Sequence, residues 1–307
     1  MYFLHLLEQI RTPLLNNIML FLTRGGEEIV FIVMVMVLLW CVNKNSAYML
    51  LLVGLTGNNI NQVLKVSFRV LRPWVLDPTL NPVQSAIPAA TGYSFPSGHT
   101  QSAVGTFGTV ALSLKNRFFK VAAISLAVLV AFSRMYLGVH TPKDVIVSVL
   151  VATALITVYY FVFKLINQNK KGMCILFLAV IALFIAQIIF LSVYLKGSND
   201  ELISGLKNAY KMLGAVCGLL LSYFLDKKYI NFETKAPLLV QIIKVLLGLC
   251  ATLAVKEICY FVFSFIKFAP LSRGISYFIM VVFAGAVWPL TFPIIKKLLT
   301  QKTMAKN

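Results

Sequence analysis

Residues 173–195 read MCILFLAVIALFIAQIIFLSVYL, a run without a single charged side chain. About 20 apolar residues is the length that an α-helix needs to cross the hydrocarbon core of a bilayer. The whole chain has this character, because 59% of its 307 residues are hydrophobic, 12% are charged, and the mean hydropathy is +0.86. A soluble fold of this size could not cover so much apolar surface. The sequence therefore predicts an all-α protein, a polytopic membrane helical bundle.

Similar apolar runs recur along the chain and predict about nine transmembrane helices. They fall at 28–42, 46–65, 98–114, 120–136, 144–163, 173–195, 205–225, 237–262 and 274–295. The first five carry the polar motifs described below, and the last four carry no comparable cluster. We therefore expect a membrane core at 1–166 and a C-terminal four-helix membrane extension at 167–307.

Residues 1–23 differ from the spans, because their apolar residues fall on one face of a helix that Pro13 interrupts. This pattern predicts a kinked N-terminal helix that lies in the membrane interface. The alternative is a weakly apolar first transmembrane helix. The first residues lack a basic region and a small-residue cleavage site, so no cleavable signal peptide is expected.

The formal net charge is +18. In a soluble protein this would indicate nucleic acid binding, but in a membrane protein the cytoplasmic loops collect Lys and Arg. With nine spans, every loop on the same side of the membrane as the C-terminus contains Lys or Arg. That side also holds the larger share of the Lys and Arg residues in the loops. We therefore expect no nucleic acid partner, an N-terminus outside the cell membrane and a C-terminus in the cytoplasm.

The most distinctive polar residues occur in three short stretches, two of which contain histidines. The first runs from Lys65 over six residues to Arg72 and Pro73. The second is Pro96-Ser97-Gly98-His99, and the third is Ser133-Arg134, five residues, His140, three residues and Asp144. With the predicted topology, all three lie at the extracytoplasmic face.

The cations in these stretches predict an anion site. Lys65, Arg72 and Arg134 stand at the outer ends of apolar helices. A single charged side chain there would indicate little, because it can reach the polar membrane interface. Three together suit a multiply charged anion, and Arg matches phosphate oxygens in a bidentate way. Ser97 and Gly98 open a predicted helix, whose free N–H groups favour phosphate. The alternative for Ser97 is an ordinary helix N-cap.

His140 precedes Thr141-Pro142-Lys143-Asp144, which has the residues of a helix capping box. Asp144 also stands four residues after His140, within reach of one ring nitrogen. An acid in that position fixes the tautomer of the ring and leaves the other nitrogen free to attack. Capping and catalytic orientation of Asp144 remain compatible at this stage.

These residue types predict phosphoryl transfer through a histidine. Cations and N–H groups would stabilise charge on the phosphoryl oxygens, one histidine would attack phosphorus, and the second would protonate the leaving oxygen and then activate water. No carboxylate cluster suits a metal, and no Cys stands near a His at metal-ligand spacing, so neither a metal nor another cofactor is expected.

The three stretches together resemble the signature of the type 2 phosphatidic acid phosphatase family, which shares its fold with vanadium haloperoxidases and bacterial acid phosphatases. Eleven fixed positions agree in order between residues 65 and 144. The resemblance implies a phosphatase with phosphate bound by Lys65, Arg72, Ser97, Gly98 and Arg134. It also implies that His99 is the acid, His140 the nucleophile and Asp144 its partner.

The expected function is hydrolysis of a membrane lipid phosphate or isoprenyl diphosphate at the extracytoplasmic face, through a phosphohistidine. The candidates are phosphatidic acid, phosphatidylglycerol phosphate and undecaprenyl diphosphate. One alternative is a lipid phosphotransferase that uses the same intermediate. The other is a non-enzymatic membrane transporter, since ionisable residues within spans can mark pathways. The oligomeric state stays open.

Overall fold

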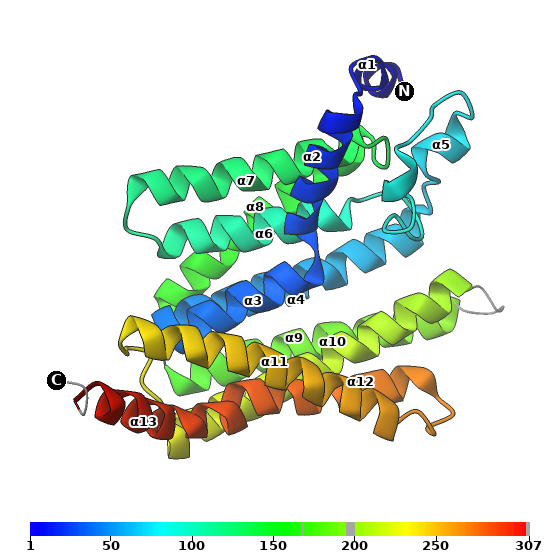
Figure 1. Ribbon diagram of the computed structural model, residues 1–307. Helices are drawn as coiled ribbons and strands as arrows, with labels where there is room; N and C mark the ends of the chain where they lie inside the picture. Colours follow the sequence, from blue (N-terminus) through cyan, green and yellow to red (C-terminus); the bar gives the residue numbers. More distant parts are fainter. Residues whose placement is uncertain (167–168, 195–199, 305–307) are drawn as a thin grey trace. The chain divides into compact units, whose positions relative to one another are not determined.

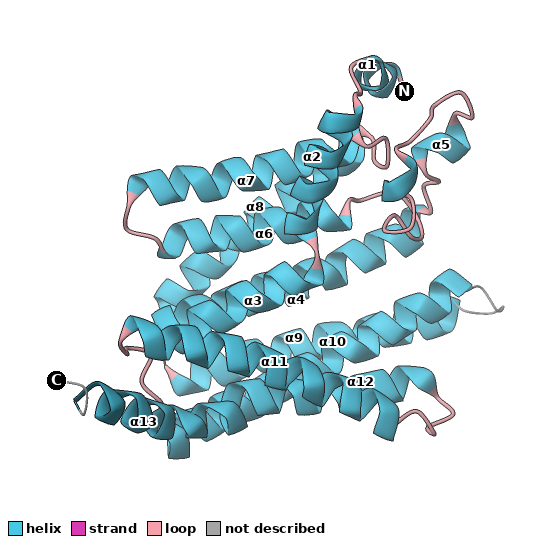
Figure 2. Ribbon diagram, viewed as in Figure 1, coloured by secondary structure: helices cyan, strands magenta, loops and turns pink. Residues whose placement is uncertain are grey.

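A computed structural model describes residues 1–166, 169–194 and 200–304 of the protein. Within these ranges the chain forms helices joined by loops and turns, with no strand, as the sequence predicts (Figure 2). The chain divides into two compact units. Unit 1 comprises Met1–Met34 and Met49–Leu165, and unit 2 comprises Val35–Tyr48 and Ile166–Asn307. The boundary that the sequence predicts at residue 167 falls outside the described ranges.

Unit 1 contains the first eight α-helices, coloured from blue to green in Figure 1, except for the end of α3, the start of α4 and the last residue of α8. In chain order these are α1 (Tyr2–Gln9), α2 (Pro13–Thr23), α3 (Glu28–Val37), α4 (Lys44–Phe68), α5 (Pro73–Leu76), α6 (Gly98–Ser113), α7 (Arg117–Tyr136) and α8 (Pro142–Ile166). Helices α6 and α7 pack along each other around buried Ala103, Phe107, Ala127 and Val130. The loop between α4 and α6 carries α5 and the motif residues Arg72, Pro73, Pro96 and Ser97.

Unit 2 contains α9 (Lys170–Tyr194), α10 (Asp200–Leu225), α11 (Leu238–Val262), α12 (Ala269–Val282) and α13 (Phe292–Met304). Helices α10 and α12 approach closely, because a Cβ on Gly218 would lie only 2.7 Å from the carbonyl oxygen of Phe278. Small residues at such contacts are typical of membrane helices. This unit also contains a partly buried ion pair, since Nζ of Lys44 lies 2.8 Å from both carboxylate oxygens of buried Asp226.

Six helical segments of the described ranges are long and apolar enough to cross a membrane: Arg117–Tyr136, Pro142–Ile166, Lys170–Tyr194, Ile203–Ile230, Leu238–Val262 and Ala269–Leu298. The pair Pro13–Gly26 and Glu28–Val42, bent by 53°, forms a seventh if it counts as one span. The prediction of a multi-pass membrane protein is therefore confirmed. Length and composition support six or seven of the nine predicted spans.

Two predicted spans, α4 and α6, do not meet these length and composition criteria. Helix α6 has only 16 residues. Helix α4 has 25 residues, but the side-chain amides of Asn58, Asn59, Asn61 and Gln62 lower its hydropathy. These amides lie within two turns of Lys65, at the end of α4 that leads to the polar loop.

The N-terminal segment is interrupted at Pro13, as the sequence predicts. Helix α1 ends at Gln9, and α2 begins at Pro13 with Thr12 as its N-cap. Helix α1 is attached to the loop between α4 and α6, since Nε2 of His5 lies 2.9 Å from a carboxylate oxygen of Asp77. Nε of Arg11 donates to the carbonyl oxygen of Tyr136 at 2.9 Å. The N-terminal segment thereby contacts the loop between α4 and α6 and the end of α7, both of which carry motif residues.

Candidate active site

His140 lies in a tight turn between α7 and α8. Helix α7 ends at Tyr136, and Gly138 has a φ of +76°, a left-handed conformation that glycine adopts without strain. The N–H groups of Val139 and His140 then donate to the carbonyl oxygen of Arg134, at 3.2 and 3.3 Å. The five-residue spacing between Arg134 and His140 therefore holds both residues at the same end of α7.

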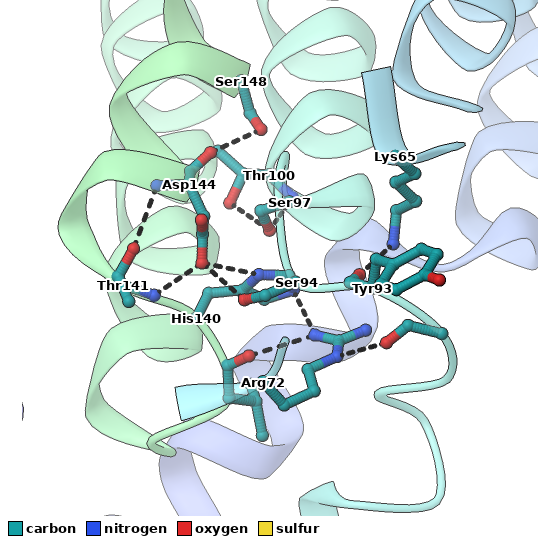
Figure 3. A network of polar contacts seen from close by, with 12 residues as sticks. Lys65, Arg72, Tyr93, Ser94, Ser97, Thr100, His140, Thr141, Asp144 and Ser148 are labelled. Carbon is teal, nitrogen blue, oxygen red and sulfur yellow. Dashed lines mark hydrogen bonds and ion pairs between the residues drawn. The ribbon is translucent and has the colours of Figure 1, made fainter. Parts of the chain in front are cut away.

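Both nitrogens of the His140 ring face charged groups (Figure 3). The side chain is 2% exposed. Nδ1 lies 3.5 Å from Oδ2 of Asp144, close but too long for a good hydrogen bond, and Nη1 of Arg72 lies 3.1 Å from Nε2. Because a guanidinium only donates, this contact assigns the lone pair to Nε2 and the proton to Nδ1, which faces the carboxylate. In this tautomer Nε2 carries the free lone pair of the ring.

The electrostatic surroundings keep the His140 ring neutral. Burial lowers the pKa of His140 well below its usual value of 6.5, and the charges of Arg72, Arg134 and Lys65 lower that pKa further. The contact with Asp144 opposes these effects and raises the pKa. His140 therefore holds a free lone pair at neutral pH, as a nucleophile requires.

Asp144 both caps α8 and faces the His140 ring, the two contacts that the sequence allows. Its Oδ2 accepts from the N–H of Thr141 at 2.8 Å, and its own N–H donates to Oγ1 of Thr141 at 3.3 Å, so the predicted capping box is confirmed. The same Oδ2 faces the His140 ring and accepts a 2.6 Å hydrogen bond from Oγ of Ser94. The cap fixes the carboxylate in the orientation that faces the histidine.

Arg72 and Lys65 are held by backbone carbonyl groups of the loop before α6 (Figure 3). Nε and Nη2 of Arg72 donate to Gly92 and Thr91 at 2.8 and 2.6 Å, and its Nη1 donates to Val139 at 3.0 Å. Nζ of Lys65 donates to the carbonyl oxygen of Tyr93 at 2.8 Å. The six-residue spacing between the two cations thus spans the end of α4 and places both against the same short loop segment.

Ser97 is the N-cap of α6, as the alternative interpretation of the sequence predicts. Its Oγ accepts from the N–H of Thr100 at 3.4 Å and from Oγ1 of Thr100 at 2.9 Å. The N–H of Ser97 donates to the carbonyl oxygen of Asp144 at 3.3 Å, which joins the start of α6 to the start of α8. Gly98 and His99 follow as the first residues of α6, where backbone N–H groups lack helical partners.

The end of α2 and the turn before α3 also contact the candidate site residues. Nη1 of Arg134 donates to Oγ1 of Thr23 at 2.7 Å, and both side chains are buried. Gly26 packs directly on the backbone of His99, since a Cβ there would lie 2.6 Å from the His99 carbonyl oxygen. Nε and Nη2 of Arg134 are buried and have no hydrogen-bond partner among the described residues.

All eight residues predicted for the site lie in unit 1. Direct contacts join His140 with Asp144 and Arg72, and the same three cations, Lys65, Arg72 and Arg134, act electrostatically on both His99 and His140. The described residues show no direct contact between the two histidines. The arrangement is thus a positively charged site with a neutral histidine, oriented by a carboxylate, at its edge.

Ser94 and Thr23 are two of the contacting residues that were not predicted from the sequence. Ser94 stands in an irregular loop, and its distance from Asp144 along the chain gives no signal of a contact. Thr23 lies outside the three motif stretches, in a segment whose sequence indicates only the end of a helix. The pair Gly25-Gly26 is a sequence signal for close packing that did not enter the prediction of the site, and the sequence does not say which backbone it contacts.

Comparisons with known proteins give similarities in both halves of the chain. The PAP2 superfamily profile matches residues 45–168, and the profile of the PAP2 superfamily phosphatase transmembrane extension matches residues 210–300. The first match contains all three motif stretches. No solved structure matches the chain.

Among curated proteins, the chain is 34% identical to an undecaprenyl-diphosphatase of Sulfolobus acidocaldarius over 43% of its own length and 63% of that protein. It is 32% identical to the undecaprenyl-diphosphatase BcrC of Bacillus subtilis, over 45% of the chain and 69% of BcrC. The phosphatidylglycerophosphatase B of Bacillus subtilis is 29% identical over 45% of the chain and 70% of that protein. The chain thus spans about two thirds of the length of these relatives.

Proposed function

Because the chain belongs to the PAP2 superfamily, we propose that it is an integral membrane phosphatase that hydrolyses a lipid phosphate or isoprenyl diphosphate through a phosphohistidine. One observation carries the proposal. His140 is buried, its Nδ1 faces Asp144, and its Nε2 faces the cation Arg72. A phosphoryl group that binds to Arg72 would therefore lie next to Nε2. In this proposal His140 is the nucleophile, His99 the acid and Asp144 the partner of His140. The other five predicted residues bind phosphate.

The proposed reaction has two steps. In the first, Nε2 of His140 forms a bond to phosphorus while the bond from phosphorus to the leaving oxygen breaks, and His99 gives its proton to that oxygen. In the second, water attacks phosphorus, its proton passes to His99, and the bond to His140 breaks to release phosphate. Lys65, Arg72, Arg134 and the start of α6 stabilise charge on the phosphoryl oxygens in both steps.

A lipid substrate is supported by the relatives and by apolar side chains near the site. The relatives are named for undecaprenyl diphosphate and phosphatidylglycerophosphate. Phe68 is 60% exposed and packs edge-to-face on Phe95, with ring centroids 5.2 Å apart, just before the Ser97 cap. Val75 and Leu76 of α5 are also exposed. These residues would contact the apolar part of a lipid whose headgroup enters the site.

The site geometry also supports nine spans. Arg72 follows α4 and His140 follows α7, and their side chains are 3.1 Å apart. Between these two residues the chain passes through α6 and α7, so a crossing by α7 requires one by α6. Gly26 precedes α3 and packs on His99, which follows α4, so a crossing by α3 requires one by α4. We therefore propose that α4 and α6 cross as well, with their amide-rich and Ser97 ends at the site. The charge pattern then gives an outer N-terminus, a cytoplasmic C-terminus and an extracytoplasmic site.

The N-terminal and C-terminal regions complete the proposal. The exposed apolar residues of α1 include Tyr2, Phe3 and Leu6, which suit a helix in the membrane interface beside the site. Residues 1–166 would form the phosphatase core and 167–307 a membrane extension, an organisation that the two profile matches support.

A phosphate-release panel tests the function. The purified protein in detergent is given phosphatidic acid, phosphatidylglycerol phosphate and undecaprenyl diphosphate, beside the His140→Ala variant. Release by the wild type with at least one lipid, and none by the variant, is expected, together with an acid-labile phosphoprotein in the wild type only. Equal rates for the two proteins would refute the proposal. Transfer of phosphate to an added alcohol instead of water would favour a phosphotransferase.

A further inference from the structure

Asn61 is a buried amide without an assigned role in the site. It lies on α4 one turn before Lys65, so both side chains project from the same face of the helix. Its side chain is 4% exposed, and its Nδ2 has no hydrogen-bond partner among the described residues. Buried polar groups are nearly always paired, so an unpaired amide donor requires an explanation.

The position of Asn61 gives one. Its Oδ1 lies 3.9 Å from the position that a Cβ on Gly98 would occupy. The carboxamide therefore sits against the first residue of α6, where free N–H groups face the proposed phosphate site. Gly98 has no side chain to separate the two groups.

Arg134 shows the same shortage of acceptors. Its Nε and Nη2 are buried without a partner among the described residues, although Nη1 is bonded to Thr23. Unpaired donors thus reach the site from α4 and from α7. A phosphoryl group offers several anionic oxygens, and each can accept from more than one donor, so one such group would satisfy both side chains.

We propose that Asn61 is a further substrate-binding residue, whose side-chain N–H donates to an oxygen of the phosphoryl group beside Gly98. This inference rests on the proposed function, because it assigns the anion to the substrate. A neutral amide is well suited to this position. It adds a donor without adding charge to a site that already has three cations and in which His99 must also carry a proton.

Vanadate binding tests this assignment, because vanadate mimics a phosphoryl group and its binding needs no turnover. Asn61→Leu removes the donor at similar volume, and Asn61→Asp replaces it with a negative charge. Gln62→Leu is the matched control, an adjacent amide that points away from Asn61 on the same helix. The measurements are the vanadate dissociation constant, kcat and KM on the best lipid of the panel, and the melting temperature in detergent.

Loss of one hydrogen bond to an anion predicts a roughly 10- to 100-fold weaker vanadate affinity in Asn61→Leu, and a larger loss in Asn61→Asp. Gln62→Leu should stay within about twofold of the wild type. Wild-type vanadate affinity in a folded Asn61→Leu variant would overturn the inference, and so would a loss of melting temperature with unchanged affinity. Failure of the proposed function is separate, because it would appear as equal phosphate release by the wild type and His140→Ala.

Discussion

The contact between Gly26 and His99 predicts that a single methyl group will misplace the proposed acid. In Gly26→Ala, the new Cβ would lie 2.6 Å from the His99 carbonyl oxygen and 2.9 Å from its Cα and Cβ. Ordinary contacts begin near 3.4 Å, so His99 and residue 26 must separate by about 0.5–0.8 Å. The backbone of a helix start cannot rotate aside as a flexible side chain can, so the shift must reach the imidazole.

A displacement approaching 1 Å at a reacting group costs on the order of 10²-fold in rate, so we expect kcat to fall roughly 10- to 100-fold. Gly25→Ala is the matched control. Its Cβ would meet Cγ2 of Val130 at 2.9 Å, a similar intrusion onto a movable side chain. We expect a small loss of stability in that variant and a kcat within about threefold of the wild type.

The assay compares two leaving groups in the first turnover, before breakdown of the phosphohistidine requires His99 as a base. A lipid alkoxide needs a proton to leave, whereas p-nitrophenolate leaves without one. Gly26→Ala should therefore slow the lipid phosphate much more than p-nitrophenyl phosphate. Equal slowing of both substrates, or a folded variant with the activity of Gly25→Ala, would refute this account of His99.

Three further predictions follow from buried groups. Burial lowers the pKa of His140, and the proposed nucleophile must be neutral, so activity should persist as pH falls and decline only below pH 6.5. Asp144→Asn removes the contact that raises this pKa, so the acid limb of the kcat/KM profile should move to lower pH. An acid limb at or above pH 6.5 would contradict this. Ser94→Ala removes the 2.6 Å hydrogen bond to Asp144, which should lower kcat by about 10- to 100-fold at unchanged melting temperature; unchanged kcat would exclude an orienting role. Asp226→Asn leaves the Lys44 charge without its carboxylate and should lower the free energy of unfolding by about 3–5 kcal/mol. The double variant Lys44→Met, Asp226→Leu removes both charges and should lose less stability. Denaturation in detergent measures both effects.

The order and spacing of the motif residues were sufficient to predict part of the local geometry of the candidate site. Lys65 and Arg72 flank the end of α4, and Arg134 and His140 flank the end of α7. Such short spacings around a helix end are local, so they can be predicted from the sequence. The Thr141–Asp144 cap was predicted for the same reason, because a capping box involves only neighbouring residues. The break at Pro13 follows from the missing N–H of proline.

The number of spans shows where local reading is insufficient. Composition alone supports α7 and α8 as spans, but not α4, whose amides lower its hydropathy. One of those amides, Asn61, is buried against Gly98 at the start of α6. The contact between Gly26, before α3, and His99, after α4, supports a crossing by α4 that hydropathy does not.

By itself, the sequence determined the membrane class, the helical fold and the eight candidate residues, because apolar run length and motif spacing are properties of continuous chain. Only the tertiary structure decided which groups complete the site. Thr23 reaches Arg134 across 111 positions and Ser94 reaches Asp144 across 50. Hydrogen bonds and close contacts of this kind depend on how helices pack, and no local pattern in the sequence encodes them.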